Sequence, residues 1–201
     1  MSAPRPDPSH AAKLALRDQL ITARGRLPVA EIAERARLLA GLLLGTEEVR
    51  RAATVAAYVS VGREPGSGPL LASLVAAGKR VILPLLLPDG DLDWAAYQGP
   101  EGLLPASRGL LEPVGRSLGC DAVATADAVL VPGLAVDRRG IRLGRGGGSY
   151  DRALGRVPVG TFTCVVLNAT EVLDAVPHAG HDRRVTAVAT EEGLRRFSPT
   201  A

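Results

Sequence analysis

The sequence predicts a three-layer α/β domain in which helices flank a largely parallel central sheet. Short apolar runs rich in Val, Ile and Leu alternate with longer segments of helical periodicity, and such alternation is typical of βαβ units. The chain has 201 residues, of which 46% are hydrophobic, enough for one domain to bury a core. Because no internal repeat or linker divides it, we expect a single domain over residues 10–201 and a disordered tail over residues 1–9.

Two helices are expected near the amino terminus. Apolar residues recur there at helical spacing over residues 10–27 and 29–44, and Gly45 ends the second run. Beyond them, short apolar runs alternate with helical segments, as a parallel sheet with crossover helices requires. Strands are expected at residues 53–61, 80–87, 92–98, 126–131, 159–167 and 185–190, and further helices at residues 68–77 and 150–155. Residues 101–119 contain several Gly and Pro and are expected to form loops.

Composition and charge argue against several classes of protein. The formal net charge is only +3, the basic residues are scattered, and aromatic residues make up 3% of the chain, so we expect no nucleic-acid partner. No stretch approaches the roughly 20 apolar residues of a membrane span, and the first ten residues lack an apolar signal-peptide core. Cys120 and Cys164 are isolated, which favours free thiols in a reducing cytoplasm. We expect a cytoplasmic monomer.

The segment GRGGGSYD, residues 144–151, is the most informative part of the chain. Its glycines leave backbone N–H groups unobstructed, Arg142 and Arg145 add positive charge, and the helix expected next also favours an anion at its start. Glycine clusters are more often only flexible surface loops, but a linker has no need of flanking arginines. We therefore interpret the segment as a phosphate cradle. It is neither a Walker loop, since no lysine follows Gly148, nor a dinucleotide fingerprint, since Ser149 stands where the third glycine belongs.

Basic residues at Lys13, Arg17 and Arg24 lie at offsets of four and seven, so they share one stripe of the first predicted helix. A solvated basic edge is the commonest fate of such residues. Alternatively, the stripe reaches the phosphates that the glycine segment holds from the other side. The pattern by itself leaves both interpretations open.

Three carboxylates also allow two interpretations each. Asp151 follows the cradle, where a carboxylate would meet a metal bound to phosphate, or it only complements a helix dipole, an effect worth roughly 0.3–1 kcal/mol. Asp182, between His181 and Arg183, is either a ligand or half of a loop ion pair. Glu64 follows a predicted strand, where parallel-sheet enzymes place ligand groups, or it is an ordinary exposed glutamate.

The string VPGLAVDRRGIRLGRGGGSYDRAL, residues 131–154, closely resembles the signature of the 5-formyltetrahydrofolate cyclo-ligase family, VPGLAFDxxGxRLGRGGGYYDRxL. Weaker matches occur in family order and extend the resemblance over nearly the whole chain. They are the K-x-x-x-R pair Lys13 and Arg17, EPGSGPLL at residues 64–71, VPHAGHDRRVTAVAT at residues 176–190, and Pro84, Glu112 and Pro113 at the LP and EP positions of the family.

The resemblance implies a fold like that of CoA transferases and sugar-phosphate isomerases. It also implies an activity, the ATP-dependent conversion of 5-formyltetrahydrofolate to 5,10-methenyltetrahydrofolate with release of ADP and phosphate, through phosphorylation of the formyl oxygen. ATP would be the co-substrate and Mg²⁺ the metal. Lys13 and Arg145 would be catalytic, and the ATP contacts would be Lys13, Leu14, Ala15, Leu16, Arg17, Arg142, Leu143, Gly144, Arg145, Gly146, Gly147, Gly148, Ser149 and Tyr150. The folate contacts would be Arg17, Val59, Glu64, Arg145 and Ser149, and the metal ligands Asp151 and Asp182.

The chain departs from the family pattern at two positions. Ser149 replaces a common tyrosine and Val136 a frequent phenylalanine, so the folate pocket is expected to differ in shape. Trp94 is either a substitute stacking surface or a core residue. Two other functions are compatible with a phosphate cradle on this scaffold: a sugar-phosphate isomerase-like enzyme, and a non-catalytic module that binds nucleotide or folate.

Overall fold

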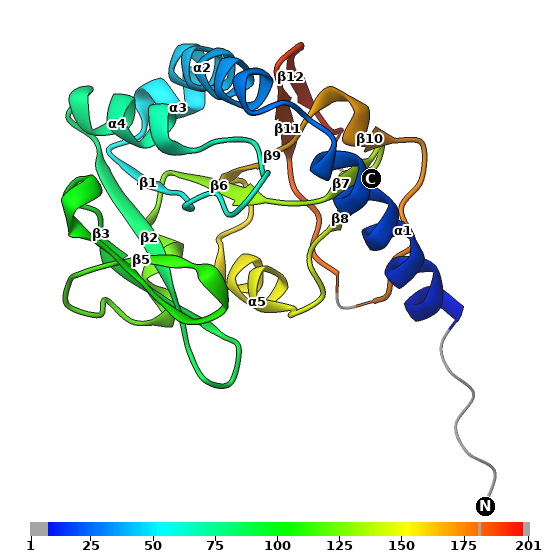
Figure 1. The fold of residues 1–201 in the computed structure, drawn as a ribbon. Coiled ribbons are helices and arrows are strands. Elements are labelled where there is room, and N and C mark those ends of the chain that lie inside the picture. The colour runs from blue at the N-terminus through cyan, green and yellow to red at the C-terminus, as the bar shows by residue number, and fades with distance from the viewer. Residues whose placement is uncertain (1–7, 181, 199–201) are drawn as a thin grey trace, which may run out of the picture.

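The computed structural model describes residues 8–180 and 182–198, and in this part of the chain helices cover both faces of a seven-stranded sheet (Figure 1). The strands in sheet order are β12 (Gly193–Arg196), β11 (Ala187–Thr190), β9 (Phe162–Val166), β6 (Ala128–Pro132), β1 (Thr54–Ala56), β2 (Arg80–Leu86) and β3 (Leu92–Ala96). The inner pairs are parallel, and only the edge strands β3 and β12 pair antiparallel with their neighbours. The predicted α/β class with a largely parallel central sheet is confirmed.

Alternating strand residues build two apolar layers. Val55 and Leu130 belong to the layer that also contains residues of α2 (Val29–Gly45) and α4 (Gly68–Ala76), with α3 (Glu47–Arg51) beside them. Ala56, Val129 and Val131 face the opposite layer, which contains residues of α5 (Ser149–Arg156). Because both faces of the sheet are covered, its central strands are almost uniformly apolar rather than alternating with polar residues.

A second, smaller sheet carries the remaining helix, α1 (Pro8–Gly25). Its strands are β10 (Val172–Leu173), β7 (Ala135–Asp137) and β8 (Arg142–Leu143). Leu16 and Leu20 of α1 pack against Leu134, Ile141 and Leu143 of this region. Helix α1 runs along this small sheet and not over the central sheet that α2 and α4 cover (Figure 1).

Several predicted boundaries were wrong. The strand expected at residues 53–61 ends at Ala56, since the chain then turns outward and Val61 donates its N–H to the Glu64 carboxylate. Residues 101–119, expected as loop, contain a hairpin of β4 (Leu103–Pro105) and β5 (Leu111–Pro113), with short 3₁₀ turns η1 (Pro100–Gly102) and η2 (Ser107–Gly109). Two further 3₁₀ turns are η3 (Cys120–Thr125) and η4 (Ala169–Glu171).

Helix α1 begins at Pro8, so residues 8 and 9 are helical rather than part of the expected tail, and residues 1–7 lie outside the described part. The small sheet was not predicted, because strands of two or three residues are too short to show a period. Among the described residues, no helix has the length and apolar character that crossing a membrane requires.

Candidate functional site

A cavity of about 400 Å³ opens where β1, β2 and β6 reach their carboxyl ends. This edge of a parallel sheet is where ligands of α/β proteins bind. One wall comes from α1 and the segment between β8 and α5, and the other from β2, β3 and the β4–β5 hairpin. The predicted site residues that line it are Lys13, Arg17, Val59, Glu64, Arg142, Leu143, Gly144, Arg145, Gly146, Gly147, Gly148, Ser149, Tyr150, Asp151 and Asp182.

The glycine segment connects β8 directly to α5 and needs glycine at two of its positions. Gly146 has φ +103°, and a β-carbon there would lie 3.3 Å from the guanidinium carbon of Arg17. Gly148 has φ +69° and caps α5 through its backbone, without a side-chain hydrogen bond. Residues with a β-carbon are disfavoured in both conformations. The first N–H groups of α5, which have no partner within the helix, therefore start at the cavity wall, as an anion site requires.

Two residues of α1 reach this segment from the far end of the sequence. Lys13 Nζ donates to Asp182 Oδ2 at 2.5 Å, and Arg17 Nε donates to the carbonyl oxygen of Gly144 at 2.9 Å. Their offset of four residues places them on one face of the helix. Lys13 is only 8% exposed. Thus Arg17 is held against the glycine segment and Lys13 against Asp182, and the two cations do not form a solvated edge.

The three residues between this pair do not line the cavity. Leu14 and Ala15 are exposed, and Leu16 packs against the small sheet. A helix presents only residues three or four apart on one face, so a run of five consecutive ligands was incompatible with α1. Side-chain contacts to ATP from Leu14, Ala15 and Leu16 are therefore not supported by their positions.

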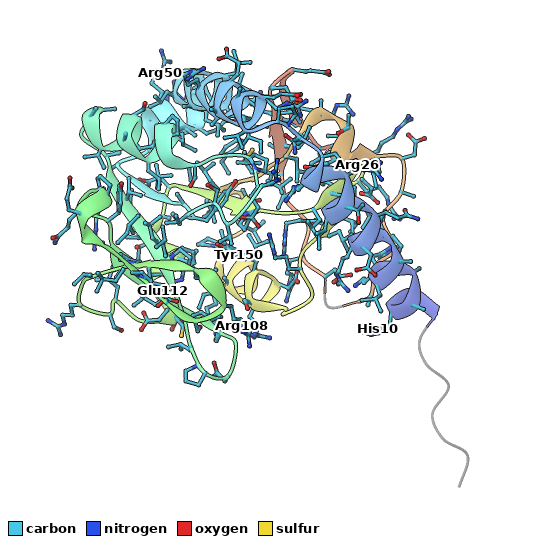
Figure 2. The ribbon with its side chains drawn as sticks, in the orientation of Figure 1. His10, Arg26, Arg50, Arg108, Glu112 and Tyr150 are labelled. Carbon is cyan, nitrogen blue, oxygen red and sulfur yellow. The ribbon has the colours of Figure 1, made fainter. Side chains whose placement is uncertain are left out.

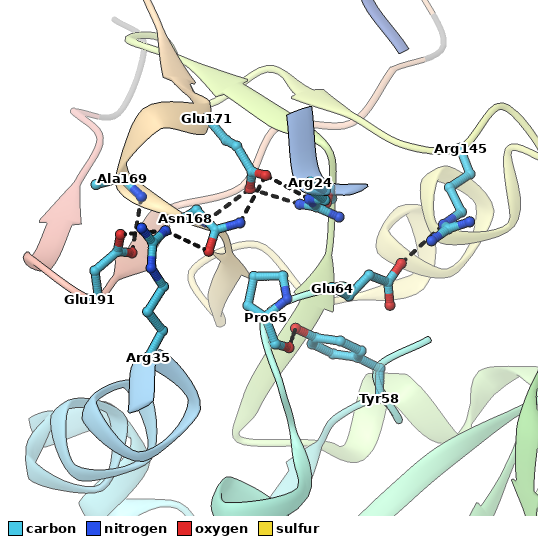
Figure 3. Close-up of polar contacts among 11 residues, drawn as sticks. Arg24, Arg35, Tyr58, Glu64, Pro65, Arg145, Asn168, Ala169, Glu171 and Glu191 are labelled. Carbon is cyan, nitrogen blue, oxygen red and sulfur yellow. Dashed lines mark hydrogen bonds and ion pairs between the residues drawn. The ribbon is translucent and has the colours of Figure 1, made fainter. Parts of the chain in front are cut away.

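Arg24, the third residue of the basic stripe, has a different environment. Its Nε and Nη2 donate to the two carboxylate oxygens of Glu171 at 2.6 and 2.7 Å, and Nη2 also donates to the carbonyl oxygen of Gly133 at 2.7 Å (Figure 3). Both members of the pair are 4% exposed. Burial pulls the pKa of Arg24 down, but the hydrogen bond and charge of Glu171 raise it by more. Arg24 thus fastens α1 to η4 and to the turn after β6.

The two candidate metal ligands lie side by side. Asp151 Oδ1 accepts from Arg142 Nη2 at 3.2 Å and from the backbone N–H of Arg183 at 3.2 Å. Arg183 follows Asp182 directly, so one backbone segment fixes both carboxylates at the same wall. No group of three or more His, Cys, Asp or Glu residues suited to a metal occurs in residues 8–180 and 182–198. Two carboxylates fit Mg²⁺, which usually takes few protein ligands and completes its shell with phosphate and water.

Glu64 and Arg145 form an ion pair across the cavity mouth. Arg145 Nε donates to Glu64 Oε1 at 3.0 Å, while Glu64 Oε2 accepts the N–H of Val61 (Figure 3). The arginine side chain is 55% exposed and the carboxylate side chain 7% exposed. Glu64 is therefore the buried partner, and Arg145 is the exposed partner that solvent or a ligand can reach.

Comparison with known proteins agrees with this geometry. The model of the 5-formyltetrahydrofolate cyclo-ligase family matches residues 9–191, which include every residue named so far in the cavity. The chain belongs to this family. It is 41% identical over 187 residues to the 5-formyltetrahydrofolate cyclo-ligase of Mycolicibacterium smegmatis, a match that covers 90% of this chain and 95% of that protein. The cyclo-ligase of Escherichia coli is 37% identical over 103 residues, covering 50% of this chain and 57% of its own length.

Solved structures resemble the chain over most of its length. The NMR structure of Aquifex aeolicus 5,10-methenyltetrahydrofolate synthetase superposes with a TM-score of 0.80 and 27% identity, covering 94% of both chains. The synthetase from Mycoplasma pneumoniae gives a TM-score of 0.69 at 17% identity over 88% of this chain and 96% of that one, a likeness of fold alone. The cyclo-ligase fold thus places the glycine segment, α1 and the two aspartates around one cavity.

Aromatic residues are distributed unevenly around this cyclo-ligase cavity. Tyr58 and Tyr150 line it, and burial raises the pKa of both phenols above the ordinary value, with the charge of Glu64 adding to the effect. The Arg142 guanidinium lies 5.7 Å from the centre of the Tyr150 ring. Trp94 is 1% exposed in the core beneath α5, so it is a core residue and offers no stacking surface.

Most of the second wall was missed by sequence reasoning. The additional lining residues are Tyr58, Val61, Pro84, Leu86, Leu92, Arg108, Leu110, Leu111, Glu112, Pro132 and Gly133. Figure 2 shows Arg108 and Glu112 on the side of the hairpin, opposite α1, with Tyr150 between. Pro84, Glu112, Pro132 and Gly133 fell in positions that match the family pattern, and that match was a signal for them. Residues 108–112 reach the cavity because β4 and β5 pair, which their short apolar segments did not reveal.

Proposed function

We propose that this chain converts 5-formyltetrahydrofolate to 5,10-methenyltetrahydrofolate with consumption of ATP and release of ADP and phosphate. The observation that carries the proposal is the convergence of four distant segments on one cavity. Lys13 and Arg17 of α1, Glu64 after β1, the glycine segment with Asp151, and Asp182 all meet there. Family membership and the names of the relatives supply the substrate.

The phosphate groups of ATP bind at the glycine segment in this proposal. The N–H groups at the start of α5 donate hydrogen bonds to phosphate oxygens, and Arg17 and Lys13 add charge from the other side. Arg145 leaves Glu64 or uses its remaining N–H groups to reach the γ-phosphate. An N-formyl group is a poor electrophile, so phosphorylation of its oxygen activates it. Catalysis of that phosphoryl transfer rests on positioning the substrates and on neutralising charge, without a protein nucleophile.

The reaction then proceeds in two displacements. The formyl oxygen attacks the γ-phosphate, its bond to phosphorus forms, and ADP leaves. The nitrogen at position 10 of the folate next attacks the activated formyl carbon, and phosphate departs with the former formyl oxygen. The folate is held against the glycine segment, with its formyl oxygen facing the phosphate, by Arg17, Val59, Glu64, Arg145 and Ser149.

Mg²⁺ would be held by Asp151 and Asp182, where it would offset charge on the phosphates. Asp151 is paired with Arg142 and Asp182 with Lys13, so a metal held by these carboxylates would compete with both cations, which would then be available to phosphate. Asp151→Asn keeps the shape and removes the charge. We expect a higher Mg²⁺ requirement and lower turnover, and an Mg²⁺ titration that overlays that of the parent would show that Asp151 only anchors Arg183 and Arg142.

The deciding experiment measures ADP release with and without 5-formyltetrahydrofolate. Folate-dependent ADP release with formation of the methenyl product supports the cyclo-ligase reaction. A sugar-phosphate isomerase-like enzyme would need no ATP, and a binding module would bind both ligands without turnover. The proposal includes a single domain, a cytoplasmic location and a monomeric state. Light scattering during size-exclusion chromatography tests the monomeric state.

A further inference from the structure

Glu112 brings a carboxylate into the apolar wall of the cavity. It lies in β5 of the hairpin, where Figure 2 labels it. Its neighbours along the chain, Leu110 and Leu111, line the same cavity, and so do Leu86 and Leu92 of the strands behind it. An anionic group in such a setting loses hydration without a compensating polar surface.

One polar contact of Glu112 explains its position but not its charge. The backbone N–H of Leu86 donates to Glu112 Oε1 at 2.9 Å and thereby ties β5 to the end of β2. Among residues 8–180 and 182–198, Oε2 of Glu112 has no hydrogen-bond partner, and neither oxygen has a cationic one. A neutral acceptor would serve equally well as a tie between the two strands.

The other carboxylates of the cavity are all neutralised. Each is paired with its own cation: Glu64 with Arg145, Asp151 with Arg142, and Asp182 with Lys13. Glu112 is therefore the one cavity carboxylate, in the described part of the chain, whose negative charge no protein cation balances. An ionised carboxylate has about four lone-pair sites and only accepts hydrogen bonds. A ligand that satisfies it must bring N–H or O–H donors, which excludes an ionised phosphate or another carboxylate.

The folate matches this requirement with its pterin ring, whereas ATP offers donors only from its ribose hydroxyls and one adenine amino group. The pyrimidine half of a pterin carries its 2-amino group beside a ring N–H, so two donors point the same way and fit both oxygens of one carboxylate. Adenine places its amino group next to a ring nitrogen that only accepts, which would face the second oxygen and repel it. We propose that Glu112 binds the aminopyrimidine edge of the pterin ring. This inference rests on the proposed function.

The test compares Glu112→Gln with the parent on two substrates, 5-formyltetrahydrofolate and its analogue in which a methyl group replaces the 2-amino group. The glutamine keeps the shape and the bond to Leu86 but loses the charge and one of the two acceptors. Since a hydrogen bond to a charged group contributes about 1.5–3 kcal/mol, we expect KM for the natural folate to rise by about 10- to 100-fold. KM for ATP should stay unchanged, and the parent's preference for the 2-amino compound should disappear in the variant.

Glu101→Gln is the matched control, because Glu101 is an exposed glutamate in η1 of the same segment and does not line the cavity. Thermal unfolding of both variants checks that the hairpin is retained, and calorimetric binding of the two folates repeats the comparison without turnover. An unchanged preference for the 2-amino compound in Glu112→Gln overturns the inference, and so does a rise confined to KM for ATP. If the parent itself neither binds nor converts 5-formyltetrahydrofolate, the proposed function fails instead.

Discussion

The buried pair Arg24–Glu171 gives the sharpest prediction about what holds α1 at the site. Arg24→Met removes the guanidinium and leaves the Glu171 carboxylate, which is 4% exposed, without its two charged donors. Breaking a buried pair from one side costs about 3–5 kcal/mol, because the remaining charge stays desolvated. For a chain of this length each kcal/mol lowers Tm by about 2–4 °C, so we expect a fall of roughly 6–20 °C.

The double variant Arg24→Met with Glu171→Met separates charge from packing. Replacing both partners of a buried pair by apolar residues is often neutral or stabilising, so most of the lost stability should return. The control is the exposed pair Arg196–Glu48, which has the same two-bond geometry at 2.9 Å but a half-exposed arginine side chain. Breaking that pair should cost about 1 kcal/mol or less.

Urea denaturation of the parent, the single variants and the double variants measures these differences. The second measurement is KM for ATP. It reports whether Lys13 and Arg17 stay at the cavity once the hydrogen bond from Arg24 to the carbonyl oxygen of Gly133 is lost. We expect a higher KM for ATP in the Arg24–Glu171 double variant and an unchanged KM for ATP in the double variant of the control pair. The reasoning is refuted if the free energy of unfolding of the single variants lies within about 1 kcal/mol of that of the parent. The charge of Glu171 would then not be buried as it is in the structure.

Three other predictions concern separate parts of the molecule. Arg145→Ala should leave the fold intact and reduce turnover at low ATP by about 100-fold or more, as loss of a group that stabilises transition-state charge does; near-normal turnover there would remove Arg145 from the phosphate site. Ser149→Tyr should lower KM for 5-formyltetrahydrofolate and leave KM for ATP unchanged, since stacking on an aromatic ring is worth about 1–3 kcal/mol; lower KM for ATP instead would reverse the two faces of the segment. The hydrogen bond from Arg156 lowers the pKa of Asp91, so that pair stabilises the fold above the ordinary Asp pKa of about 3.9 and the effect is lost as pH falls through the lower value. Asp91→Asn should therefore be less stable than the parent at pH 6, and the gap should close on acidification in urea titrations.

The sequence alone determined the parts of the protein that depend on local pattern. The glycine run predicted a segment with unobstructed backbone N–H groups, and Gly146 and Gly148 adopt the positive φ that glycine allows. Apolar runs predicted the central strands, since a sheet covered on both faces needs uniformly apolar residues. The spacing of Lys13 and Arg17 predicted a shared helix face, which is correct, whereas Leu14 and Ala15, expected as ATP contacts, are exposed beside them.

Only the tertiary structure decided which of these residues meet. Lys13 and Asp182 are 169 positions apart and form one ion pair, and no local periodicity carries that information. Arg24 belongs to the same basic stripe as Arg17, yet it is buried against Glu171 because the helix passes over η4 at that point. Glu112 reaches the cavity only through the pairing of two three-residue strands, a long-range contact. Residue type and spacing fix what a side chain can do, and packing of distant segments fixes what it faces.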